Sequence, residues 1–95
     1  MTRIIILSTC DEWKSCASFR LYGTWASSKA GCRRLFKTII KGIKEGLFVY
    51  ENEDISCEEQ IKNFMEDEKR KCLTTFLYDL QSKLIYGNLE MSELR

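Results

Sequence analysis

A short apolar run near the start of the chain restricts the fold most. Residues 3–9 (RIIILST) are rich in β-branched side chains, do not alternate with polar ones and are bounded by polar residues. An uninterrupted apolar run of this length is typical of a strand that is buried on both faces. We therefore predict a central strand at residues 3–9.

Residues 19–26 (FRLYGTWA) predict a second strand, because apolar and polar positions alternate along them. The link between the two runs, residues 10–18, is short, so the strands should be antiparallel. The alternation places Phe19, Leu21, Gly23 and Trp25 on one face and Arg20, Tyr22 and Thr24 on the other.

The next segment predicts a helix from the cap candidates Ser27 and Ser28 to about Glu45. Its apolar positions recur every three or four residues, as an amphipathic helix requires. These positions are Ala30, Cys32, Leu35, Phe36, Ile39, Ile40 and Ile43. Gly46 is a natural helix stop, and residues 47–50 (LFVY) predict a third, short strand.

The second half of the chain predicts further helix and a last strand. Ser56 and Glu59 form a capping box, but the apolar stripe that follows falters across the charged residues 66–71. One helix over residues 57–83 would be about 40 Å long, so we expect a break near residues 68–75, with Thr74 or Thr75 as the next cap. Residues 85–91 (IYGNLEM) predict the final strand, for which an edge position in the sheet is one option.

This order of elements, β-β-α-β-α-(α)-β, predicts an α+β fold in a single domain, residues 1–95. We expect a small, mainly antiparallel sheet of about four strands with two or three helices on one face. No apolar stretch approaches the ~18 residues of a membrane span, and the first one is too short for a signal peptide. The sequence therefore predicts a soluble protein of the cytoplasm (the host cell cytosol) that does not contact a membrane.

The cysteines favour reduced thiols, because their number is odd, their spacing is wide and no secretory signal precedes them. They are Cys10, Cys16, Cys32, Cys57 and Cys72. No two cysteines have the close spacing of a zinc-ligand pair, since five residues separate even Cys10 and Cys16, and the chain has no histidine. Without histidine it also lacks the usual base that activates a cysteine nucleophile. We predict no metal site, no cofactor and no catalytic residue, and hence a non-enzymatic protein.

Charge is divided between the two halves of the chain. Residues 1–50 contain nine Lys/Arg and three Asp/Glu, whereas residues 51–95 contain six and eleven. The net charge of +1 therefore conceals a polarised molecule, and such polarity bears on binding partners.

The positive charge is concentrated on the helix predicted after Ser28. Opposite the apolar stripe it carries Lys29, Arg33, Arg34, Lys37, Lys41 and Lys44. Arg33, Arg34, Lys37 and Lys41 are the candidates for contacts with phosphate groups of a nucleotide or a nucleic acid. The alternative is a solvated helix face, since no aromatic residues are interleaved there to stack on bases.

Two further segments are candidates for binding a partner protein. In the loop after the first strand, Trp13 beside Lys14 is either a lid over the sheet edge or an interface anchor. The second segment is acidic and contains Glu51, Glu53, Asp54, Glu58 and Glu59. It lacks the ligand spacing of a calcium loop, so it either pairs with the basic helix, stays solvated or docks on a basic partner.

The first half of the chain resembles small uncharacterised proteins of phages and mobile elements. The resemblance rests on a strand (residues 4–9), a polar loop, a second strand (residues 19–25) and the cap Ser27-Ser28 before Lys29-Ala30. It covers about half the chain. It implies a context in which small phage proteins bind and disable host proteins, including defence complexes.

The leading hypothesis is therefore a small binding protein that inhibits a host defence complex by occluding its surface. The first alternative is a sponge for a nucleotide signal, and the second is an accessory protein that binds nucleic acid. The oligomeric state is open between monomer and homodimer; Gly31 and Gly42, inside the predicted helix, suggest close packing against another backbone, which a second subunit could provide.

Overall fold

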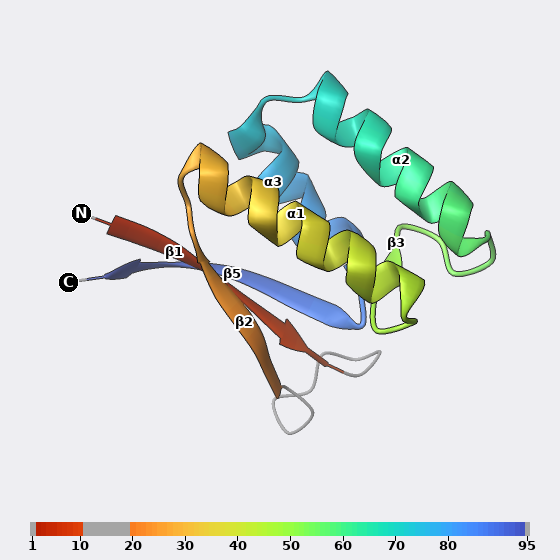
Figure 1. Ribbon diagram of the computed structural model, residues 1–95, viewed down its shortest axis with the longest axis horizontal. Coiled ribbons are helices and arrows are strands. Elements are labelled where there is room, and N and C mark those ends of the chain that lie inside the picture. The colour runs from red at the N-terminus through yellow and green to blue at the C-terminus, as the bar shows by residue number, and fades with distance from the viewer. Residues whose placement is uncertain (1, 11–19, 95) are drawn as a thin grey trace.

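The computed structural model describes residues 2–10 and 20–94 (Figure 1). Their elements are, in order, β1 (Thr2–Thr9), β2 (Arg20–Ala26), α1 (Lys29–Lys44), β3 (Val49–Tyr50), α2 (Cys57–Arg70), α3 (Leu73–Lys83), β4 (Leu84–Ile85) and β5 (Gly87–Leu94). The α+β prediction is confirmed. The trace has a Cα radius of gyration of 12.8 Å.

The main sheet has three strands in the order β2-β1-β5, and both pairings are antiparallel. The apolar run at residues 3–9 therefore forms the central strand, as predicted. The short strands β3 and β4 pair with each other in a separate two-stranded sheet. The expected sheet of about four strands is thus divided into three strands and two.

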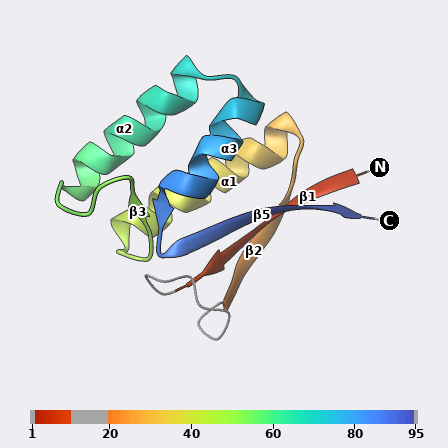
Figure 2. The same ribbon diagram turned by 180° about the vertical axis from the view of Figure 1, so that it is seen from behind.

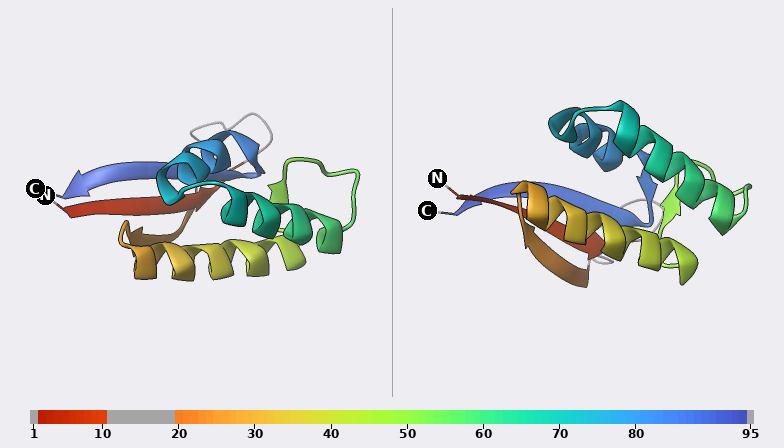
Figure 3. Two further views of the ribbon diagram at one scale, coloured as in Figure 1. Left: turned by 90° about the horizontal axis from the view of Figure 1, so that it is seen from above. Right: turned by 45° about the horizontal axis from the view of Figure 1, so that its top comes forward.

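All three helices lie on one face of the main sheet (Figures 1 and 3). Helix α1 contacts β2 and α2, helix α3 contacts β5, β4 and α2, and helix α2 also contacts β3. Between the helices, the rings of Phe36, Phe64 and Phe76 meet edge to face, with centroids 5.1–5.8 Å apart. Tyr50 adds a fourth ring, 5.2 Å from Phe64. This aromatic cluster fixes the helices to one another through dispersion and quadrupole contacts.

The helix-free face of the sheet corrects one expectation about the central strand. Ile5 and Leu7 point toward the helices and are fully buried. Ile4 and Ile6 point the other way and are only half-buried, because no layer of the described chain covers that face (Figure 2). The continuous apolar run therefore marks a central strand with one buried face, not two.

A β-bulge in β2 corrects the predicted alternation. Leu7 pairs with Gly23 but Ser8 pairs with Leu21, so Tyr22 is an extra residue in the strand. Because of it, the Tyr22 ring turns to the helix side and packs on Phe48, with centroids 5.3 Å apart. Leu21 is left 71% exposed.

The predicted helix caps are largely confirmed. Ser28 Oγ accepts a hydrogen bond from the Gly31 N–H at 3.2 Å, and Ser56 Oγ accepts one from the Glu59 N–H at 3.1 Å. The expected break lies between Arg70 and Leu73. Its cap is Cys72, not Thr74 or Thr75.

Gly31 and Gly42 are explained within one chain, which removes the sequence argument for a second subunit at this helix. A Cβ at Gly31 would lie 2.1 Å from the carbonyl oxygen of Ala26. A Cβ at Gly42 would lie 2.3 Å from Cδ2 of Phe48. Both glycines let the chain's own neighbouring segment approach α1.

Candidate functional site

The acidic candidates lie on the turn from β3 to α2 and on the first turn of α2. Glu51, Glu53, Asp54, Glu58 and Glu59 are all exposed. The other predicted partner-binding residues, Trp13 and Lys14, lie outside the described residues.

Hydrogen bonds hold this acidic turn in place. Gln60, which is 4% exposed, accepts a bond from the Tyr50 N–H and donates one to the Ile55 carbonyl, each 3.0 Å long. The Tyr86 hydroxyl donates to Glu53 at 2.9 Å. The turn is therefore tied at both ends, so its carboxylates present a defined surface.

The six Lys and Arg side chains of α1 form a basic face and are exposed along the whole length of the helix. Within residues 2–10 and 20–94, none of these six side chains forms an ion pair. The recorded ion pairs join Lys71 to Asp79 and Lys83 to Asp67. Both lie in the second half of the chain, so within the described residues the positive charges of α1 are not neutralised by ion pairs with its acidic residues.

A groove runs along one side of this basic face. A cavity of about 360 Å³ opens between α1, the end of α2 and the start of α3. It is lined by Lys29, Arg33, Phe36, Glu68, Leu73 and Phe76. A second cavity of about 220 Å³ shares Arg33, Phe36 and Glu68 with it and continues along α1 past Lys37 and Ile40. We call the two together the basic groove.

The basic groove combines a charged lip with an apolar floor. Lys29, Arg33 and Lys37 follow one another at intervals of four residues and so lie on one line of the helix. Phe36 and Phe76 form part of the floor, and Glu68 is the one carboxylate in the lining. Such a lining suits a ligand that carries an anionic group on a flat apolar body.

The structure divides the four predicted phosphate contacts. Arg33 and Lys37 line the basic groove, whereas Arg34 and Lys41 are exposed elsewhere on α1. Phe76 and Leu73 were not predicted as site residues. They reach the groove because the chain reverses after Arg70, and no local pattern reveals which helix the returning segment will meet.

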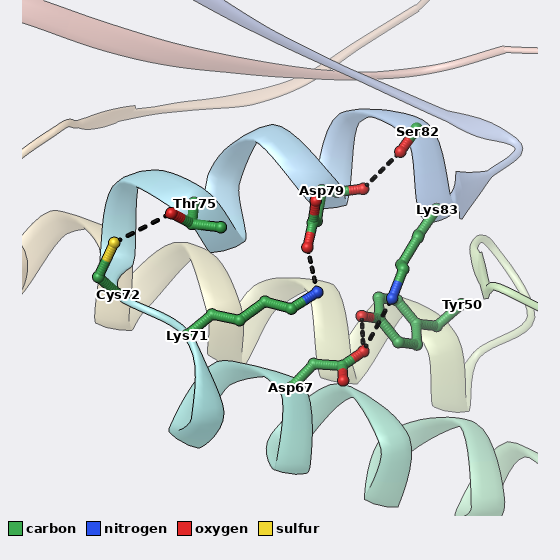
Figure 4. Close-up of polar contacts among 8 residues, drawn as sticks. All are labelled: Tyr50, Asp67, Lys71, Cys72, Thr75, Asp79, Ser82 and Lys83. Atoms are coloured by element: carbon green, nitrogen blue, oxygen red, sulfur yellow. Dashed lines mark hydrogen bonds and ion pairs between the residues drawn. The ribbon is translucent and has the colours of Figure 1, made fainter.

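A polar network connects α2, α3 and β3 (Figure 4). The buried Tyr50 hydroxyl donates to Asp67 Oδ2 at 2.6 Å, and Lys83 Nζ contacts the same oxygen at 3.2 Å. Lys83 Nζ also lies 5.9 Å from the centroid of the Tyr50 ring. Lys71, in the turn between the helices, pairs with Asp79 of α3.

The network shifts the acidity of its members in opposite directions. Burial, and then the hydrogen bond to Asp67, raise the pKa of Tyr50 above its ordinary value. The hydrogen bond from Tyr50 lowers the pKa of Asp67, with Lys83 acting the same way and burial opposing both. A protonated tyrosine and an ionised aspartate are therefore the stable pair. No local sequence pattern indicated this network, since Tyr50 and Lys83 lie 33 positions apart.

Cys72 is the exposed cysteine with an unusual environment. Its sulfur lies 3.1 Å from the Thr75 hydroxyl at the start of α3. The hydrogen bond with Thr75 lowers the pKa of the Cys72 thiol, so more of it is thiolate near neutral pH.

In the part of the chain that the structure describes, no three Cys, Asp or Glu side chains gather in a way that could hold a metal ion. No helix there is both long enough and apolar enough to cross a membrane. Comparisons with protein-family models, with characterised proteins and with solved structures find no match to this chain.

Proposed function

We propose that this chain is a small non-enzymatic binding protein that inhibits a host protein complex by docking on it and occluding its surface. The observation that carries the proposal is the absence of ion pairs on the basic face of α1 within the described residues. Exposed charges of one sign that are not neutralised internally favour association with a surface of the opposite sign.

The acidic turn supports the same function from the other half of the molecule. Its carboxylates are exposed, and the bonds of Gln60 hold its backbone. A preorganised charged surface loses less entropy on binding than a mobile one. The resemblance of the first half to phage and mobile-element proteins is the reason to look for the partner among host defence complexes.

The experiment is affinity capture from host lysate with the wild-type chain and three double variants. Arg34→Glu with Lys41→Glu reverses the basic face outside the groove, and Asp54→Lys with Glu58→Lys reverses the acidic turn. If the partner binds through charge, the amount captured should fall at least tenfold with one of these two double variants. The partner should be retained with Lys62→Glu and Lys69→Glu, on the exposed side of α2.

The captured complex must also lose activity when wild-type chain is added at stoichiometric amounts. Equal capture by all variants, or capture without inhibition, would contradict the proposal. A captured protein alone, without this pattern, does not support it.

The basic groove favours a second candidate, a sponge for a nucleotide signal. Lys29 and Arg33 would neutralise phosphates, and the apolar floor would accept the base. A thermal-shift panel of linear and cyclic nucleotides tests this, because a ligand at 100 times its dissociation constant adds about 2.7 kcal/mol of stability. Arg33→Gln should abolish the shift and Arg34→Gln should not.

The same protein tests the accessory nucleic-acid hypothesis. Binding through the α1 cations would retain the chain on single- and double-stranded DNA or RNA at low salt, and retention would fall steeply as salt is added. If the chain were not retained on DNA or RNA at low salt, this alternative would be excluded and the other two proposals would be unaffected.

A further inference from the structure

The outer edge of β5 is a regular strand edge with no strand beside it in the described chain. β5 pairs with β1 in one continuous register, from Thr9 opposite Gly87 to Thr2 opposite Leu94. The opposite edge of the sheet differs, because the bulge at Tyr22 interrupts β2. Bulges are one of the devices by which proteins protect an edge from further pairing. The regular edge is therefore the one able to accept another strand.

The direction of the main-chain groups in β5 follows from one hydrogen bond between β1 and the residue that follows β2 and from the register of β1 with β5. The Ser27 N–H donates to the Arg3 carbonyl at 3.2 Å, so odd-numbered residues of β1 turn their main-chain groups toward β2. Even-numbered residues of β1 then bond to β5, including Ile4, which lies opposite Ser92. In β5 the main-chain groups of Leu89, Met91 and Glu93 consequently face outward.

Helix α3 covers only the beginning of this edge. Gln81 Nε2 donates to the Leu89 carbonyl at 3.1 Å, which agrees with the outward direction of that group. Past this point a cavity of about 320 Å³ lies between α3 and residues 90–92 of the strand. Tyr78, which is 61% exposed, forms one of its walls. Figures 1 and 2 show β5 continuing beyond the helices toward the C-terminus.

We propose that this edge pairs with β5 of a second copy of the chain. The two strands run antiparallel, with Met91 opposite Glu93 of the partner subunit and Ser92 on the two-fold axis. This register uses the outward groups of Met91 and Glu93 and leaves the Leu89 carbonyl to Gln81. It joins two three-stranded sheets into one of six strands.

Symmetry favours this occupant. The register places Glu90 opposite Leu94 of the partner subunit and Glu93 opposite its Met91, so no two carboxylate positions are directly opposite, and the two Glu93 positions are diagonal neighbours across the axis. Like charges directly opposite would destabilise a strand pair. An isologous contact needs only one self-complementary edge, which a regular antiparallel strand provides through its main chain. The exposed Tyr78 flanks the junction, and tyrosine is enriched at interfaces.

Sedimentation equilibrium tests the pairing without a cross-link. The wild-type chain should reach twice its mass of 11.2 kDa as its concentration rises. Glu93→Pro removes one outward N–H of β5 and should return the protein to a monomer. Thr24→Pro removes an outward N–H at the β2 edge and should leave the dimer intact. Circular dichroism verifies that each variant is folded.

A disulfide tests the register. Ser92 pairs across the axis with itself as a non-hydrogen-bonded pair, whose Cα atoms are about 4.5 Å apart, within the range a disulfide spans. In a Cys16→Ser, Cys57→Ser, Cys72→Ser background, Ser92→Cys should form a covalent dimer under mild oxidation, and Thr24→Cys should not. A wild-type chain that stays monomeric at several hundred micromolar, or a dimer that forms through position 24, would overturn the proposal.

Discussion

Tyr50 is fully buried and places its hydroxyl 2.6 Å from Asp67, a carboxylate that is itself 17% exposed. A hydrogen bond to a charged group is worth about 1.5–3 kcal/mol, more than a neutral one. The same contact determines how the fold responds to acid, because it holds the pKa of Asp67 below its ordinary value.

Asp67→Asn should destabilise the protein at pH 7 and much less at pH 3. Since the pKa of Asp67 is lower in the folded state, its contribution is complete above the unfolded pKa of about 3.9 and is lost as the pH falls toward the folded value. Tyr50→Phe removes the largest cause of the shift and should flatten the same dependence. Urea unfolding at pH 7, 5 and 3 measures both.

The control is Glu66→Gln, an exposed carboxylate next in sequence. If Asp67→Asn lost the same free energy of unfolding at every pH, the network would not be the source of acid sensitivity.

Cys72 should be alkylated by iodoacetamide faster than Cys57, the other exposed thiol among the described residues. The thiolate is the reacting species, and the Thr75 hydroxyl favours it. Thr75→Val keeps the side-chain shape without the hydroxyl, so the ratio of the two rates should fall several-fold. Mass spectrometry of quenched samples resolves the two sites. An unchanged ratio would mean that Thr75 does not activate the thiol.

At the scale of elements, α1 depends on two close approaches, one to β2 and one to the segment before β3. Gly31→Ala brings a Cβ against the backbone oxygen of Ala26, which can move only with the strand. Gly42→Ala brings one against the Phe48 ring, which can shift at a cost of about 1–3 kcal/mol.

Both substitutions should therefore destabilise the fold, and Gly31→Ala should do so more strongly. At an exposed helix position the same Gly→Ala change would stabilise the protein by about 1 kcal/mol. A loss of stability would therefore show that the packing clash outweighs the gain in helix propensity. Thermal unfolding measures the difference, with Lys41→Ala as the exposed control on the same helix. If Gly42→Ala were more stable than the wild-type protein, the Phe48 ring would be able to move away from the new Cβ at little cost.

The helices and the caps of the first two could be predicted because their causes are local. Ser28 and Ser56 bond to main-chain groups three residues away, and the charged run before Cys72 marks the break. The bulge at Tyr22 could not be predicted, because it depends on two non-local contacts. One is the pairing of β2 with β1, and the other is the packing of the Tyr22 ring on Phe48. Only part of the basic groove could be predicted, for a similar reason. Its cations lie on one helix, α1, whereas the apolar residues of its floor come from all three helices.

At the scale of the whole molecule, unpaired like charge on α1 should make the fold sensitive to salt. Lys29, Arg33, Lys37 and Lys41 repel one another at intervals of four residues, by about 0.2–0.5 kcal/mol for each pair. Raising NaCl from 10 to 300 mM screens this repulsion, so the melting temperature should rise.

Arg33→Gln with Lys41→Gln should reduce that salt dependence. Lys62→Gln with Lys69→Gln should not, because Lys62 has acidic residues at the same spacing on both sides. Calorimetry at several salt concentrations measures the slopes. A melting temperature that falls with salt would mean that attraction between the two halves outweighs repulsion within α1.

The pairing of β1 with β5 also determines when the chain can fold. The two strands pair along eight residues, yet the paired positions are 78 residues apart in sequence at Thr9–Gly87 and 92 at Thr2–Leu94. While the protein is being synthesised, β1 emerges from the ribosome first and has β2 on one side only. Its other edge stays open until residues 87–94 have left the exit tunnel. A nascent chain paused after α3 would expose the most apolar strand of the protein, so that pause is where a chaperone would have most to protect.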